Sequence, residues 1–197
     1  MIASFLTFAL YHLIDPFITV WLGCEYVLPH SVLIVILANF FITQFRGTND
    51  QFLFGYGLFQ DTWAPIATLI ITVMVALIGG YFWGLPGVLL GDIASSITII
   101  SVWKPYFLYK EGFKMPVSGY WKNISCYFLL FVISWGLTDL ILYLLPLLEP
   151  TQGYGVWGLF ALISSLLFLL ILGTFFYFFS YGTRMLIGRF LKLKGRK

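Results

Sequence analysis

Long apolar segments alternate with short polar ones along the chain. Six of them reach the length of a membrane helix, which needs about 20 predominantly apolar residues to cross roughly 30 Å of hydrocarbon. They lie approximately at residues 2–23, 27–45, 64–83, 85–103, 124–146 and 156–181. Residues 166–172 are apolar throughout, without the alternation of a barrel strand. Because a backbone in lipid must satisfy its own hydrogen bonds, this pattern predicts an all-α, polytopic membrane protein.

Turn-forming residues separate the apolar segments. Gly84-Leu85-Pro86-Gly87 predicts a tight turn between the third and fourth segments, and Pro29 opens the second. Pro146, Pro150 and Gly153 separate the fifth segment from the sixth. Tryptophan and tyrosine gather near the predicted ends, where amphipathic rings favour the headgroup layer. Random placement in an aromatic-rich chain is the alternative explanation.

Composition narrows the function classes. The apolar share is 60% and the charged share 10%, against roughly 45–50% and 25% in soluble domains. So few charges cannot cover a soluble fold of this length, which excludes a soluble catalytic domain. The basic residues lie in a few short connecting segments and do not form a face that could follow phosphates. We therefore expect no nucleic acid among the partners.

The basic residues predict an orientation, because cytoplasmic loops are enriched in Lys and Arg. With six spans, all 11 basic residues fall on one side of the membrane. They are Arg46, Lys104, Lys110, Lys114, Lys122, Arg184, Arg189, Lys192, Lys194, Arg196 and Lys197. We expect that side, both termini and the basic tail at residues 182–197 to be cytoplasmic. We expect a helical bundle over residues 1–181.

The cysteines give no sign of a disulfide scaffold or a zinc site. Cys24 and Cys126 are too few and too far apart, and the predicted topology places them on opposite faces, so we expect no bond between them. Apart from Asp15, no carboxylate or second histidine stands three or four residues from His12. We predict no metal site and no cofactor, and interpret His12 as a packing residue.

Three carboxylates lie inside predicted spans, where ionisable groups usually face a cavity or a partner helix. Asp92 is in the middle of the fourth segment, Asp15 precedes Pro16 in the first, and Asp139 is in the fifth. Such a carboxylate can bind and release a proton or hold Na⁺, so all three are candidates for ion coupling. For Asp15 and Asp139, near the outer face, a structural role is the alternative.

The second segment ends in polar residues. Asn39 and Gln44 precede Arg46, and residues 47–50 continue as a polar cytoplasmic mouth. An arginine there could bind a pyrophosphate headgroup, which makes these three residues candidates for substrate binding. An anchor at the membrane interface is the equally open alternative for Arg46.

The fourth segment carries small residues at helical spacing. Gly84, Gly87, Gly91 and Ser95 form a stripe that would let a neighbouring helix approach closely. We interpret this stripe as a packing face.

Motifs of the common intramembrane and phosphate-transfer enzymes are missing. The chain has no Gly-rich phosphate loop, no Ser/His/Asp or Cys/His set, and no paired carboxylates at helical spacing for Mg²⁺. We therefore expect no enzyme and assign no catalytic residue.

The order of several motifs resembles the C-terminal part of bacterial polysaccharide and O-antigen flippases of the MOP exporter superfamily. The matching pieces are Pro16-Phe17-Ile18-Thr19-Val20-Trp21-Leu22-Gly23, Phe45-Arg46-Gly47, Gly84-Leu85-Pro86-Gly87-Val88-Leu89-Leu90-Gly91 and Trp103-Lys104-Pro105-Tyr106-Phe107-Leu108-Tyr109-Lys110. Together they cover roughly residues 15–115, and the last two segments match only in character.

The resemblance implies one lobe of a transporter. Two helical lobes would enclose a cavity and pass an undecaprenyl-pyrophosphate-linked oligosaccharide to the outer leaflet, with membrane lipids around them. Members of this kind are usually much longer, so we expect a truncated reading frame whose N-terminal lobe lies elsewhere. A multidrug exporter of the same superfamily and a non-transporting membrane scaffold or assembly subunit are the alternatives.

Overall fold

The chain folds into helices. The computed structural model describes residues 1–144, 149–180 and 182–185, except for the side chains of Phe45, Arg46 and Thr48. Within these ranges there is no β-strand. The protein is therefore all-α, as the apolar pattern predicts.

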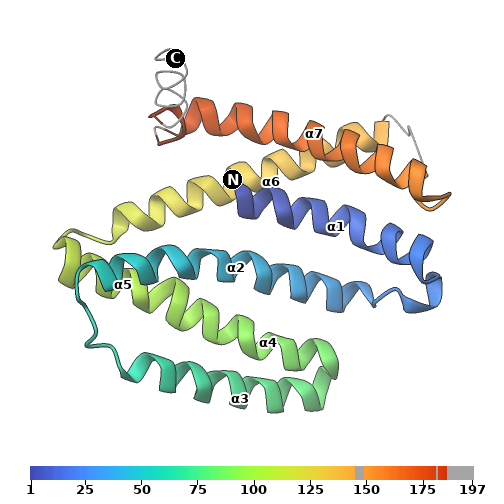
Figure 1. Cartoon of the computed structure of the whole chain (residues 1–197). Coiled ribbons are helices and arrows are strands. Elements are labelled where there is room, and N and C mark those ends of the chain that lie inside the picture. Colours follow the sequence, from blue (N-terminus) through green and yellow to red (C-terminus); the bar gives the residue numbers. More distant parts are fainter. Residues whose placement is uncertain (145–148, 181, 186–197) are drawn as a thin grey trace. The chain divides into compact units, whose positions relative to one another are not determined.

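Six helical segments are long and apolar enough to cross a membrane, so the predicted number is confirmed for the described residues (Figure 1). They are α1 (Ile2–Trp21), α2 (His30–Gly55), α3 (Trp63–Trp83), a continuous stretch of α4 (Leu85–Ser95), η2 (Ser96–Trp103), α5 (Lys104–Phe107) and η3 (Leu108–Phe113), then α6 (Ser118–Leu144) and α7 (Tyr154–Phe179). A short 3₁₀ turn, η1 (Cys24–Tyr26), connects α1 to α2. The chain is a multi-pass membrane protein.

Three helices extend past the ends that apolarity predicts. Helix α2 continues from residue 45 to Gly55, the fourth span continues from residue 103 to Phe113, and α6 begins at Ser118 instead of residue 124. Hydrocarbon thickness limits only the apolar part of a helix, and the helix itself can continue into water. The expected polar mouth at residues 47–50 is consequently part of α2.

The helices group into two compact units. Unit 1 comprises residues 1–25 and 123–197, and unit 2 comprises residues 26–122. Within the described residues, unit 1 holds α1, α6 from residue 123 onward and α7, and unit 2 holds α2 to η3 and the first residues of α6. The ion-coupling candidates therefore divide between the units: Asp15 and Asp139 belong to unit 1, and Asp92 belongs to unit 2.

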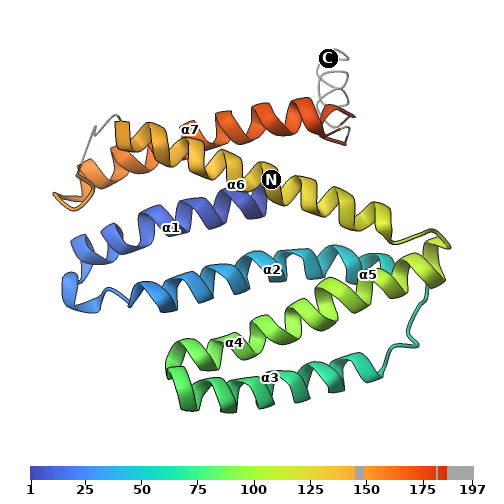
Figure 2. The ribbon, with the colours of Figure 1, turned by 180° about the vertical axis from the view of Figure 1, so that it is seen from behind.

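An antiparallel hairpin of α3 and α4 forms much of unit 2, and both views show the two helices side by side (Figures 1 and 2). Gly84 alone separates them, with a φ of +64° that favours glycine. A Cβ on Gly87 would lie 1.9 Å from the carbonyl oxygen of Gly79, and one on Gly91 would lie 2.6 Å from that of Thr72. The predicted packing face is therefore confirmed.

The fourth span changes its helical winding around Pro105. Both η2 and η3 are π-helical, and the Lys104 N–H donates to the carbonyl of Ile99, five residues back. Proline has no N–H to donate, and its ring would clash with the carbonyl four residues earlier in an α-helix. The wider π turns account for a proline inside this long helix without a break.

Polar and aromatic contacts join the extended helix ends of unit 2. Lys104 forms an ion pair with Asp50 of α2. The Asn49 side chain, which is 6% exposed, donates through Nδ2 to the Tyr120 hydroxyl at 3.4 Å. The ring of Phe113 packs against Phe52, Tyr56 and Tyr109. These contacts explain how the helices remain paired beyond their apolar parts.

The core of unit 1 is aromatic. Phe8 of α1 stacks on Phe168 of α7, with ring centroids 4.0 Å apart and the rings nearly parallel, and both side chains are fully buried. Ser134 and Thr138 of α6 are also fully buried, and each hydroxyl donates to the carbonyl four residues earlier in its own helix. Small hydroxyl residues of this kind allow close packing inside a membrane.

Candidate functional site

A histidine and an aspartate meet inside unit 1. His12 of α1 and Asp139 of α6 lie with Nε2 and Oδ1 3.0 Å apart. The side chain of His12 is 18% exposed and that of Asp139 is 41% exposed. The two atoms themselves are buried, and neither has a hydrogen-bond partner among the described residues, so the contact is an ion pair by distance alone. Asp139 lies close to the described end of α6 at Leu144.

Three aromatic rings surround the imidazole of His12. The ring centroids of Phe8, Tyr11 and Trp135 lie 4.4, 5.0 and 6.0 Å from that of the imidazole. Phe8 precedes His12 by four residues, and Trp135 precedes Asp139 by the same spacing, so each ring shares a helix face with its ionisable neighbour. The packing of α1 and α6 therefore gathers both the charges and the rings.

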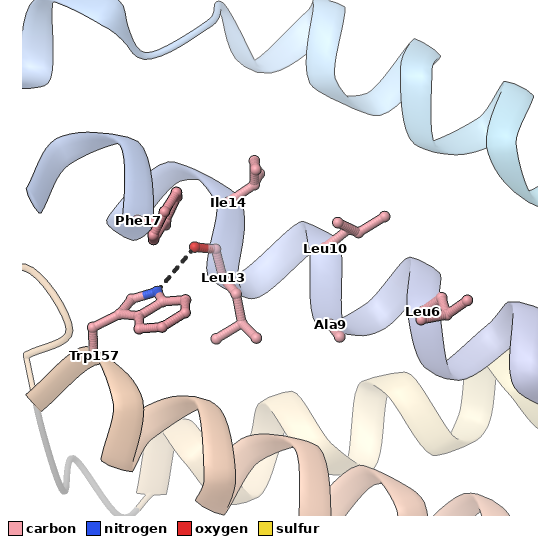
Figure 3. A pocket seen from close by; sticks show the side chains of 7 residues that line it. All are labelled: Leu6, Ala9, Leu10, Leu13, Ile14, Phe17 and Trp157. Carbon is pink, nitrogen blue, oxygen red and sulfur yellow. Dashed lines mark hydrogen bonds between the residues drawn. The ribbon is translucent and has the colours of Figure 1, made fainter. Parts of the chain in front are cut away.

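A bend-prone position follows His12 in α1. Pro16 lies inside the helix and has no N–H to donate to the carbonyl of His12. On the neighbouring carbonyl, the Trp157 indole N–H of α7 donates to the Leu13 oxygen at 3.1 Å (Figure 3). The Trp157 indole thus joins α7 to α1 at a carbonyl next to the one that Pro16 leaves without a helical donor.

Next to this hydrogen bond, α1 carries an apolar groove of about 280 Å³ (Figure 3). It is lined by Leu6, Ala9, Leu10, Leu13, Ile14, Phe17 and Trp157. Because the Trp157 N–H already has its acceptor, the groove offers only hydrocarbon surface and no site for a charged group.

Asp15 lies one turn from His12 along α1. Its side-chain Oδ1 is buried and has no hydrogen-bond partner among the described residues. Its backbone carbonyl accepts a hydrogen bond from the Thr19 hydroxyl at 2.8 Å. The carboxylate therefore adds a second negative group on the helix that carries His12.

Asp92 is exposed on α4, away from the glycine stripe that packs on α3. In the part of the chain that the structure describes, its carboxylate has no ion pair and no side-chain hydrogen bond; only its backbone carbonyl accepts one, from Ser95 Oγ. Asp92 thus differs from Asp15 and Asp139 in two ways: it belongs to unit 2, and its side chain is exposed without a partner among the described residues.

The three substrate-binding candidates all lie on α2. Asn39 is partly buried, and its Oδ1 has no hydrogen-bond partner in the described ranges. Gln44 is exposed. The backbone of Arg46 is helical, but its side chain lies outside the described residues. Their joint action on one headgroup remains a prediction.

The described residues contain no group of three or more His, Cys, Asp or Glu side chains that could hold a metal ion. Cys24 and Cys126 are both free and exposed.

Sequence reasoning missed the pairing of His12 with Asp139. The only sequence signal is that the predicted spans contain a histidine, which can carry a positive charge, as well as carboxylates. A helical spacing rule cannot find this pair, because its members come from distant parts of the chain.

Fold and site together define the class: an all-α, multi-pass membrane protein with ionisable side chains inside its spans. No family model, no curated protein and no solved structure matches the chain.

Proposed function

We propose that the chain is the C-terminal lobe of a flippase that moves an undecaprenyl-pyrophosphate-linked oligosaccharide across the bacterial inner membrane. The observation that carries the proposal is the exposed carboxylate of Asp92, which is the only charged side chain between Leu85 and Trp103 of the fourth span. The resemblance of residues 15–115 to polysaccharide and O-antigen flippases supports the choice of substrate.

The position of Asp92 favours a water-filled cavity next to α4. Asp92 lies seven residues beyond Leu85, which at 1.5 Å per residue is about 10 Å along the helix. A carboxylate at such a depth costs at least about 2.5 kcal/mol if it faces lipid. A cavity of a transporter would give this side chain the water or the cation that it needs.

In this proposal the candidates divide into two roles. Asp92, Asp15 and Asp139 act in ion coupling, while Arg46, Asn39 and Gln44 on α2 contact the pyrophosphate headgroup. The chain binds and releases its cargo without covalent chemistry, so it needs neither a catalytic residue nor a cofactor. The second lobe of the cavity comes from another segment or chain.

Deletion of the gene that encodes the chain tests this proposal. We expect surface polysaccharide to disappear and lipid-linked oligosaccharide to accumulate in the inner leaflet, and a plasmid copy to restore both. Unchanged amounts of both molecules in the deletion strain would contradict the proposal.

The same strain distinguishes the two alternatives. A multidrug exporter predicts increased sensitivity to cationic compounds with intact surface polysaccharide. A scaffold or assembly subunit predicts that polysaccharide is lost but that the variants Asp92→Asn and Asp92→Leu both restore it fully.

A further inference from the structure

We propose that His12 and Asp139 form a proton-binding site in unit 1, in which His12 carries the proton and Asp139 is its counter-ion. The 3.0 Å separation of Nε2 and Oδ1 places the two groups in ion-pair range. The inference depends on residues of this chain alone and holds whatever cargo the protein moves.

Among the residues that the structure describes, His12 is the partner with which Asp139 forms an ion pair. Residues 1–25 contain no Lys or Arg, and after Lys122 the next basic residue is Arg184. The spans α1 and α7 thus have no permanent positive charge, and α6 has one only at its far end, at Lys122. A carboxylate inside a membrane protein is stabilised by pairing, and here the pairing requires a protonated imidazole.

Aromatic rings surround the imidazole of His12 on α1 and α6. Phe8, Tyr11 and Trp135 place their ring centroids within 6.0 Å of the imidazole centroid. An aromatic ring attracts a cation at such distances, and the attraction grows where water is excluded. Phe8 is fully buried, so water is excluded from the side of the imidazole that Phe8 covers.

In the described parts of α1, α6 and α7, the other titratable side chains close to the pair along the helices carry no positive charge. They are Tyr11 and Asp15 of α1 and Tyr143 of α6, while Tyr154 and Tyr177 lie near the two ends of α7.

A pH-dependent link between two helices follows. When His12 is protonated, a charged pair joins α1 to α6; when the pH rises and His12 loses its proton, the pair becomes a neutral contact and the link weakens.

The histidine count makes the test direct. The chain has two histidines, His12 and His30, so the His30→Gln variant leaves one imidazole signal. We choose this variant, labelled with ¹⁵N-histidine in lipid nanodiscs, and find the pH at which half of His12 is imidazolium by NMR. At that pH the further change Asp139→Asn should leave about a tenth of His12 protonated, the effect of losing one opposite charge at this distance.

Two results would overturn the inference. One is an unchanged imidazolium fraction in the Asp139→Asn variant, and the other is a His12 that is already neutral at pH 5 with Asp139 present. Should Asp139→Asn not fold, Asp139→Ser serves the same comparison. Glu149→Gln is the matched control, because Glu149 is an exposed carboxylate that pairs with Gln152 outside the spans, and it should leave the His12 signal unchanged.

Discussion

A lone histidine in an apolar helix is usually a packing residue, and the sequence alone supports that interpretation of His12. The structure places it 3.0 Å from Asp139, a carboxylate on another helix. Helical spacing identifies neighbours within one helix, such as Asp15, but it contains no information about which distant helix will pack alongside. The candidate carboxylates were predictable from the sequence, but their partners were not.

Asp92 gives the clearest single-residue prediction. The variants Asp92→Asn and Asp92→Leu should lower polysaccharide export at least about tenfold, the effect of about 1.4 kcal/mol lost from the rate-limiting step. Both should reach the membrane in normal amount, because an exposed side chain leaves neither a hole nor an orphaned partner behind.

Export is measured as surface polysaccharide per cell, and membrane content by immunoblotting. Glu149→Gln is the control, since this carboxylate is exposed outside the spans. Normal export with Asp92→Leu would remove Asp92 from the site.

Turns and packing faces of the elements were predictable, and the outer helix ends were not. The tight turn at Gly84-Leu85-Pro86-Gly87 was predictable because glycine adopts a positive φ, as Gly84 does here, more easily than any other residue. The ends of α2 and η3 lie in polar sequence, where apolarity no longer marks the helix. They are held by contacts between helices, such as the ion pair of Lys104 in α5 with Asp50 in α2. Such contacts depend on how the helices are arranged in space.

The hairpin of α3 and α4 should not tolerate a side chain at Gly87. In Gly87→Ala the new Cβ would lie 1.9 Å from the Gly79 carbonyl oxygen, which is backbone and cannot rotate away. We expect the helices to separate and the free energy of unfolding to fall by about 1–3 kcal/mol, the usual effect of overpacking.

The measurement is unfolding in mixed detergent micelles followed by circular dichroism. Gly136→Ala is the matched control, because a Cβ on Gly136 of α6 meets no atom within 4 Å. Equal stability of the two variants would show that α3 and α4 lie farther apart at Gly87 than they do in the structure.

At the scale of the whole molecule, the number of spans was predictable and the division into two units was not. Span number follows from apolar length, a local property that hydrocarbon imposes on each segment. The grouping of α1 with α6 and α7 brings segments from the two ends of the sequence into one unit, while residues 26–122 between them form the other. Such a grouping arises from contacts like the Phe8–Phe168 stack, which no local pattern encodes.

The central claim is a six-span chain with its basic side in the cytoplasm, because the depth of every candidate residue depends on it. Cys24, between α1 and α2, and Cys126, in α6, are both exposed and free, and this topology places them on opposite faces. The test is treatment of intact spheroplasts with a membrane-impermeant maleimide. The Cys126→Ser variant, which retains Cys24, should be labelled, and the Cys24→Ser variant should not. Labelling of Cys126 from outside, with Cys24 protected, would contradict the account.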